Sequence, residues 1–158
     1  MRELLDIVAA FDELAGLGKP AALATVVGVE GSAYRSPGAR MLISEDGRTW
    51  GGVSGGCLER DVMQRALGVI ASGIPMLHRY DTADDEHLAT GVSTGCGGVV
   101  HILIQRVTAD APGVIPLMAS VVRDRRTLNL ATISRASGAW MNLVGSMHVW
   151  HGLPAHEH

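Results

Sequence analysis

Apolar residues recur every three or four positions in three stretches of the chain. The first covers residues 3–17, the second runs from 58 to 72, and the third opens at Pro112 and runs to Arg125. This spacing is typical of helices with one buried face. Glycines and a proline at positions 16–20 end the first stretch. The pattern therefore predicts three helices that share a core.

Short runs rich in β-branched residues separate these helical stretches and predict strands. The runs cover residues 21–29, 39–44, 49–53, 75–80, 99–104 and 127–134. Glu45-Asp46-Gly47 joins the second and third runs, and Asp-Gly suits a tight hairpin. Because helices and strands alternate around one hairpin, we predict an α/β or α+β fold in which helices pack on a mixed β-sheet.

The composition is that of one compact domain with an aliphatic core. The chain has 158 residues, 47% of them hydrophobic but only 4% aromatic, and a formal net charge of −3. This charge lacks the basic excess of a nucleic-acid-binding protein. No apolar run approaches the roughly 20 residues that cross a membrane, and the acidic N-terminal segment is unlike a signal peptide. We therefore expect a cytoplasmic protein with reduced thiols and with neither nucleic-acid nor membrane partners.

The first of the two cysteines lies in a glycine loop ahead of the second expected helix, in the segment Ser54-Gly55-Gly56-Cys57-Leu58-Glu59. A helix N-terminus favours anions and thiolates, so this loop could stabilise a thiolate, bind an anion, or both. It matches neither the Walker loop nor the Gly-x-Gly-x-x-Gly dinucleotide motif. The alternative is a tight strand-to-helix connection, with Glu59 as an ordinary acid of the first helical turn.

The second cysteine has a similar setting, Gly95-Cys96-Gly97-Gly98, just before an apolar strand. Three glycines around one thiol suggest a close backbone approach or a nest of amides; the alternative is a bulge with a buried cysteine. The sequence lacks the Cys-x-x-Cys and His-x-x-x-His pairs typical of structural zinc sites. The remaining metal hypothesis is a soft ion held by both thiolates and by atoms of a cofactor.

A third candidate is Arg35, in the turn-rich segment 31–38. A guanidinium group suits phosphate or oxyanion recognition through paired hydrogen bonds. The alternative is an ordinary solvated surface arginine.

The order of these motifs resembles that of the XdhC/CoxI family. The resemblance covers roughly residues 5–107 and is carried by Gly31-Ser32 with Arg35, by residues 52–59, and by residues 95–98 ahead of a hydrophobic strand. Members of that family are accessory proteins for molybdenum hydroxylases such as xanthine dehydrogenase. The resemblance therefore implies a chaperone that transiently binds molybdenum cofactor (molybdopterin), protects it, and delivers it to the apo-enzyme, with a cysteine desulfurase as the sulfur donor.

The resemblance also implies which residues contact the cofactor. Cys57 and Cys96 become the candidate thiols and candidate molybdenum contacts. The other cofactor-binding candidates are Arg35, Ser54, Gly55, Gly56, Glu59, Gly95, Gly97 and Gly98. No catalytic residue is expected in a chaperone. Two alternatives stay open: a thiolate-dependent sulfur transferase with Cys57 as nucleophile, and a non-catalytic docking module for a dehydrogenase or a separate Rossmann-domain partner.

Family members commonly carry a C-terminal Rossmann-type domain, whereas residues 108–158 are too few for one and contain no Gly-x-Gly-x-x-Gly. We expect residues 1–107 to form the family's N-terminal domain, and 108–150 to add a helix and strand packed on it. We expect 151–158 to be a disordered tail. Exposed sheet edges in an apolar-rich chain also suggest a homo-oligomer.

Overall fold

The computed structural model of this chain describes residues 2–82, 97–125 and 127–150. Gly95, Cys96 and the expected tail at 151–158 lie outside the described residues. The elements, in chain order, are α1 (Arg2–Gly16), β1 (Ala21–Glu30), β2 (Arg40–Ser44), β3 (Thr49–Gly51), α2 (Glu59–Ser72), β4 (Met76–Asp81), β5 (Val99–Val107), α3 (Ile115–Asp124), β6 (Asn129–Thr132), the 3-10 helix η2 (Gly138–Leu143) and β7 (Met147–Trp150).

Five strands form one sheet in the order β3-β2-β1-β5-β4, and β6 pairs with β7 in a second sheet of two strands. β1 lies at the centre, with Leu23 paired to Leu42 of β2 and to Gln105 of β5. A register shift between Val26 and Gly28 interrupts the β1–β5 ladder. The pairing is antiparallel at all five strand contacts in the described residues.

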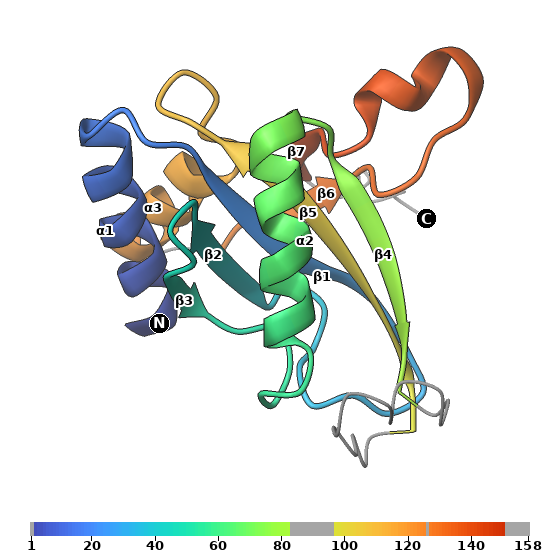
Figure 1. Cartoon of the computed structure of the whole chain (residues 1–158). Coiled ribbons are helices and arrows are strands. Elements are labelled where there is room, and N and C mark those ends of the chain that lie inside the picture. Colours follow the sequence, from blue (N-terminus) through green and yellow to red (C-terminus); the bar gives the residue numbers. More distant parts are fainter. Residues whose placement is uncertain (1, 83–96, 126, 151–158) are drawn as a thin grey trace, which may run out of the picture.

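Helix α2 covers one face of the five-stranded sheet (Figure 1). Its buried side chains pack on alternate residues of the three inner strands. This first core comprises Val62, Ala66, Val69 and Ile70 of α2 with Ala22, Ala24, Val26, Met41, Ile43, Val100, Ile102 and Ile104 of the strands, among others. The alternation follows from strand geometry, because successive side chains point to opposite faces.

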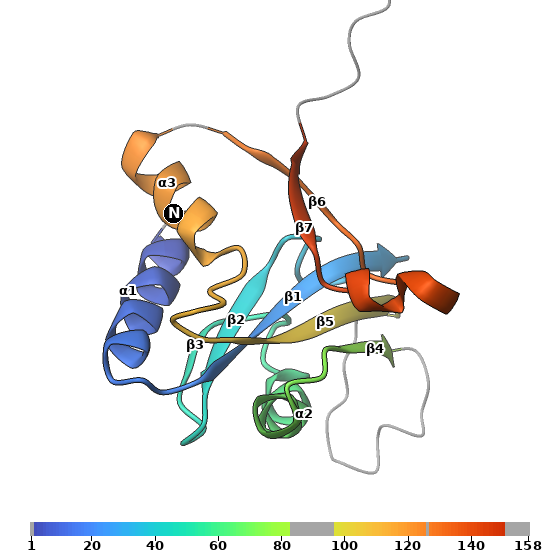
Figure 2. The same cartoon turned by 90° about the horizontal axis from the view of Figure 1, so that it is seen from above.

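The opposite face of the sheet carries α1, α3 and the β6–β7 pair (Figure 2). The second core joins α1 and α3 to the strand residues between those of the first core, and includes Ile7, Phe11, Leu14, Leu23, Leu42, Val107, Ile115 and Met118. Leu130 of β6 and Met147 of β7 pack against its edge. The sheet therefore separates two hydrophobic cores, one packed against α2 and the other against α1 and α3.

These elements confirm the prediction of helices packed on a sheet. The expected hairpin at 45–47 is the β2–β3 connection, in which the Gly47 amide donates to the Ser44 carbonyl. The sheet is antiparallel rather than mixed: the 31–39 loop and the β2–β3 hairpin each reverse the chain between neighbouring strands, and β5 also runs antiparallel to β1 and to β4. The third helix begins at Ile115 rather than Pro112 and has Pro116 in its first turn, where no amide donor is needed. No helix in the described part of the chain is both long and apolar enough to cross a membrane.

Candidate functional site

Three loops converge beside the N-terminal end of α2. They are the β1–β2 loop (31–39), the β3–α2 loop (52–58), and residues 97–98, which lead into β5. Gly98 explains why residues 97–98 can lie close to the β1–β2 loop. A Cβ placed there would overlap the Ser32 carbonyl oxygen and lie 2.7 Å from that of Glu30. Only glycine therefore lets the start of β5 lie this close to the first loop.

Gly55 explains why the β1–β2 loop can lie close to the β3–α2 loop. A Cβ at this position would lie 3.0 Å from Cγ of the Tyr34 ring. The ring packs on the backbone of the β3–α2 loop, while 72% of the tyrosine surface remains exposed. An aromatic side chain of the first loop therefore lies over the second loop, next to the segment that carries Cys57.

Thr82 connects the third loop to this region. The Thr82 amide donates to the Gly98 carbonyl over 2.9 Å, and the Gly98 amide donates to Thr82 Oγ1 over 3.0 Å. Thr82 also lines a cavity with Cys57. The described end of the second glycine motif thus lies close to the first.

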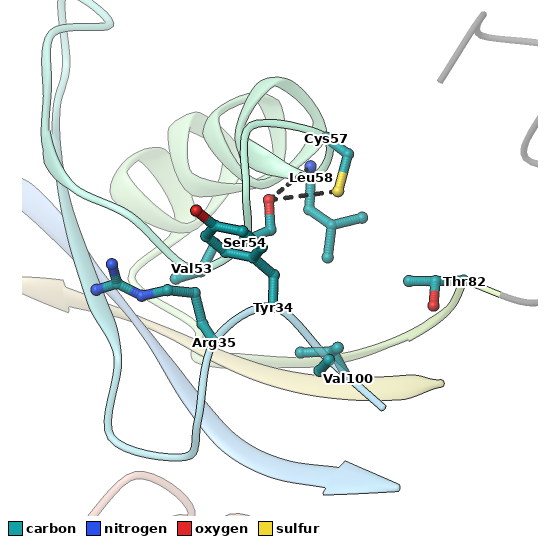
Figure 3. Close-up of a pocket in the computed structure, with 9 residues that line it drawn as sticks. Tyr34, Arg35, Val53, Ser54, Cys57, Leu58, Thr82 and Val100 are labelled. Atoms are coloured by element: carbon teal, nitrogen blue, oxygen red, sulfur yellow. Dashed lines mark hydrogen bonds between the residues drawn. The ribbon is translucent and has the colours of Figure 1, made fainter. Parts of the chain in front are cut away.

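The cavity beside Cys57 is narrow, with a volume of about 10 Å³, the space of a single water molecule. Figure 3 shows the labelled side chains around it, with the Cys57 sulfur at the end of the β3–α2 loop. We call this group the Cys57 site; its residues are Ala33, Tyr34, Arg35, Val53, Ser54, Cys57, Leu58, Thr82 and Val100. The half-buried thiol packs against the first core on one side. A larger molecule could reach it only from the surface.

Ser54 and Glu59 hold the Cys57 loop in shape. One Glu59 carboxylate oxygen, Oε1, accepts from the amides of Val53 (3.2 Å) and Ser54 (2.8 Å), and Oε2 accepts from the Ser54 hydroxyl. Ser54 Oγ in turn accepts from the Leu58 amide (3.1 Å) and from the Cys57 thiol (3.5 Å). Because the Ser54 hydroxyl donates its hydrogen bond to Glu59, Ser54 Oγ acts as an acceptor toward the Cys57 thiol.

The environment of Glu59 favours its charged form. Burial raises the pKa of this carboxyl, but the hydrogen bonds from Ser54 and Val53 outweigh burial and lower the pKa below its ordinary value of 4.5. Glu59 is therefore an ionised anchor of the loop. It is more than the ordinary first-turn acid that the sequence alone allows.

Arg35 lines the cavity through its stem, and its guanidinium points away from Cys57 (Figure 3). The guanidinium donates to Glu3 of α1 and forms an ion pair with it. The hydrogen bond to Glu3 raises the pKa of Arg35. This arginine is thus neither a free anion ligand nor an ordinary solvated one.

The structure brings most of the predicted site residues together. Ser54, Gly55, Gly56 and Cys57 lie in one loop, and Glu59 begins α2 directly after it. Arg35 lies beside this loop, and Gly97 and Gly98 adjoin it through Thr82. Gly95 and Cys96 lie outside the described residues. Within the described ranges, no group of three or more His, Cys, Asp and Glu side chains could hold a metal ion.

Sequence reasoning missed Tyr34 and Thr82 as members of the site. Tyr34 carried a weak signal, because an aromatic residue is unusual among the polar and glycine residues of 31–38. Thr82 carried none. Its place depends on a backbone pairing with Gly98 that no local pattern reports.

Known proteins are similar to this region in both sequence and fold. Residues 14–81 match the model of the XdhC and CoxI family. The chain is 43% identical over 90 residues to a probable xanthine dehydrogenase subunit of Bacillus subtilis (57% of this chain, 27% of that protein). It is 35% identical over 95 residues to the molybdenum cofactor insertion chaperone PaoD of Escherichia coli (60% of this chain, 29% of that protein).

A solved structure agrees with the sequence matches. The crystal structure of a xanthine dehydrogenase from Bacillus halodurans superposes with a TM-score of 0.66 at 31% identity, over 82% of this chain and 39% of that one. The chain therefore spans less than half the length of each of these relatives. Residues 14–81, which include Arg35, Ser54, Cys57 and Glu59, therefore carry the similarity of this chain to the XdhC and CoxI family.

Proposed function

We propose that this chain takes part in the maturation of a molybdenum enzyme by binding molybdenum cofactor transiently at the Cys57 site and passing it to an apo-enzyme. The observation that carries the proposal is a half-exposed thiol held at the meeting point of three loops. Its support from relatives is the name of PaoD, a molybdenum cofactor insertion chaperone, to which this segment is similar.

The chemistry of the site suits a cargo that must be released. A cysteine sulfur is a soft ligand and can contact a metal once its proton has left. The Cys57 thiol donates one weak hydrogen bond to Ser54 Oγ, with 3.5 Å between sulfur and oxygen, and a ligand can replace this bond. Because the cavity holds no more than one water molecule, a cofactor of pterin size lies over the loops rather than inside the fold. Such shallow binding favours reversible transfer.

Arg35 can contribute to this binding only at a cost. Its guanidinium must leave Glu3 before it can meet an anionic group of the cofactor. Both side chains of this pair are about one-third exposed, and such surface pairs contribute about 0–1 kcal/mol. The exchange therefore costs little, and Arg35 and the nearby glycine amides remain candidate contacts for the cofactor's phosphate.

The same proposal includes the partners and the second thiol. A molybdenum hydroxylase apo-enzyme would receive the cofactor and a cysteine desulfurase would supply its sulfur. Cys96, with Gly95, would be the second thiol loop, because its neighbour Gly98 is bound to Thr82 at the Cys57 site. A cytoplasmic location and self-association belong to the same hypothesis.

The test is retention of the cofactor by purified protein. Wild type, Cys57→Ala and Cys96→Ala are incubated with molybdenum cofactor and desalted, and bound molybdenum and pterin are measured. Ser36→Ala, in an exposed part of the first loop, is the matched control. We expect Cys57→Ala to retain at least tenfold less of both than wild type and Ser36→Ala. Equal retention by wild type and Cys57→Ala, whether high or negligible, would exclude the proposal.

A further inference from the structure

A second cavity is lined by residues of α1, the β1–β2 loop, β2, α3 and the segment that leads into β6. Helices α1 and α3 lie on the face of the sheet opposite α2 (Figure 2). Its volume is about 300 Å³, within the range of small-molecule sites. Most of its lining is aliphatic. We call it the Arg40 cavity; its residues are Leu4, Gly38, Arg40, Leu117, Met118, Val121, Leu128 and Leu130.

Among the described residues that line this cavity, Arg40 is the one charged residue. Its Nη1 donates to the Gly38 carbonyl over 2.9 Å. Its Nε is buried and has no acceptor, and no carboxylate in the described ranges forms an ion pair with it. Burial lowers the pKa of Arg40. A partly buried cation thus lies against an apolar cavity, and its buried Nε donor is unused.

Thr25 adds a second unpartnered polar group on the same face. It is the register partner of Arg40 across the β1–β2 ladder, so the two Cβ atoms lie about 5 Å apart. Thr25 is 3% exposed, and its hydroxyl has no hydrogen-bond partner. Buried polar groups in native proteins are nearly always paired. Thr25 itself does not line the cavity, so Arg40 is the polar side chain that a ligand there would meet.

We propose that the Arg40 cavity binds a small apolar molecule carrying one carboxylate. The carboxylate pairs with the Arg40 guanidinium, whose planar set of donors matches two carboxylate oxygens. The apolar body occupies the space lined by Leu117, Val121 and Leu130. A lone cation at an aliphatic wall selects against neutral ligands, which would leave it unpaired, and against multiply charged ones, which the leucines do not solvate.

This proposal does not depend on the proposed function, because the two cavities share no residue and the sheet lies between them. The probe is octanoate, titrated into the full chain by calorimetry. Octan-1-ol, which has the same apolar body without the charge, is the matched ligand. We expect saturable binding of octanoate at one site per chain, and at least tenfold weaker binding of octan-1-ol.

Two variants assign that binding to this cavity. Arg40→Met should weaken octanoate at least tenfold and should not weaken octan-1-ol, because the charge that selects against the neutral ligand is gone. Val121→Trp, which fills the cavity and keeps the arginine, should weaken both ligands. Arg60→Met, an exposed arginine of α2 on the other face, should weaken neither. Far-UV circular dichroism checks that each variant is folded.

Three outcomes would overturn the proposal. They are absence of octanoate binding at millimolar concentration, undiminished binding to a folded Arg40→Met, and undiminished binding to a folded Val121→Trp. Protection of this face only by a protein partner, with no octanoate binding, would likewise replace a small-molecule site with a docking surface.

Discussion

The two faces of the sheet differ in how their polar groups are partnered. On the α2 face, the Glu59 carboxylate, the Ser54 hydroxyl and the Cys57 thiol form a continuous chain of hydrogen bonds. On the α1 and α3 face, Arg40 Nε and Thr25 Oγ1 are buried without partners. Partnered groups hold a loop in one shape, whereas unpartnered ones leave free energy for a ligand to recover. The contrast teaches that hydrogen bonds hold the Cys57 loop in one shape, whereas the Arg40 side chain keeps an unused donor.

The sharpest way to disturb the α2 face is to separate its converging loops. In Gly98→Ala, the new Cβ overlaps the Ser32 carbonyl, and we expect the free energy of unfolding to fall by about 1–3 kcal/mol. Urea denaturation measures it. Gly68→Ala in α2 is the control: its Cβ meets nothing within 4 Å, and alanine there should raise stability by about 0.5–1 kcal/mol. Equal stability of the two variants would contradict the close approach.

The next effect removes the charge that anchors the Cys57 loop. Glu59→Gln keeps the shape of the side chain but loses charge-assisted hydrogen bonds from Ser54 and Val53. Such bonds contribute about 1.5–3 kcal/mol, and partial exposure places the expected loss at the lower end of that range. Denaturant melts compare it with the exposed Glu13→Gln, which should match wild type. A faster alkylation of Cys57 in Glu59→Gln should accompany the loss, since Ser54 is then less firmly placed.

On the α1 and α3 face, we expect a substitution to raise the free energy of unfolding rather than lower it. Arg40→Met removes a partly buried charge that has no ion-pair partner among the described residues, and replaces it with an apolar side chain. We expect stability to rise by about 1 kcal/mol, because an unsatisfied buried polar group costs about that much. Arg60→Met should change it by less than about 0.5 kcal/mol. A clear loss of stability in Arg40→Met, measured by thermal unfolding without ligand, would show that the guanidinium is already well partnered.

The smallest effect is a difference in pH dependence. Hydrogen bonds lower the pKa of Glu59 against the effect of burial, and those from Tyr80 and Arg65 do the same for Asp61. Groups with lowered pKa contribute stability above their unfolded pKa, and lose it as pH falls through the folded pKa. Stability should therefore be constant above about pH 5 and fall below about pH 4.5. The loss of stability on acidification should be smaller in Glu59→Gln than in wild type, by less than about 1 kcal/mol. An equal loss in the two proteins would show that Glu59 is not favoured in its ionised form.

The local elements could be predicted from the sequence because their signals are local. The three-to-four spacing of Ile7, Phe11 and Leu14 reports the buried face of α1, and Asp46-Gly47 reports the β2–β3 hairpin. Strand order carries no such signal. It depends on β1 lying between β2 and β5, a pairing between segments about 75 residues apart, and periodicity alone does not report it.

The candidate site was predictable to the extent that glycine marks close backbone approaches. Gly55 and Gly98 each lie where a side chain would collide with another loop, so the glycine motifs located two of the three converging segments. Of the partners in those approaches, Tyr34 gave only a weak signal as an aromatic residue in a polar loop, and Thr82 gave none. Arg40 was hidden for a similar reason: its lack of a partner exists only once β2 lies under α1 and α3.

The hydrogen bonds between Thr82 and Gly98 have a consequence for how this protein can vary. They close the sheet on both sides of the segment between these two residues, so the scaffold does not depend on that segment's length. Doubling the length of a closed loop costs only about 0.6 kcal/mol of chain entropy. Insertions between Thr82 and Gly98 should therefore leave the register of β4 against β5 unchanged.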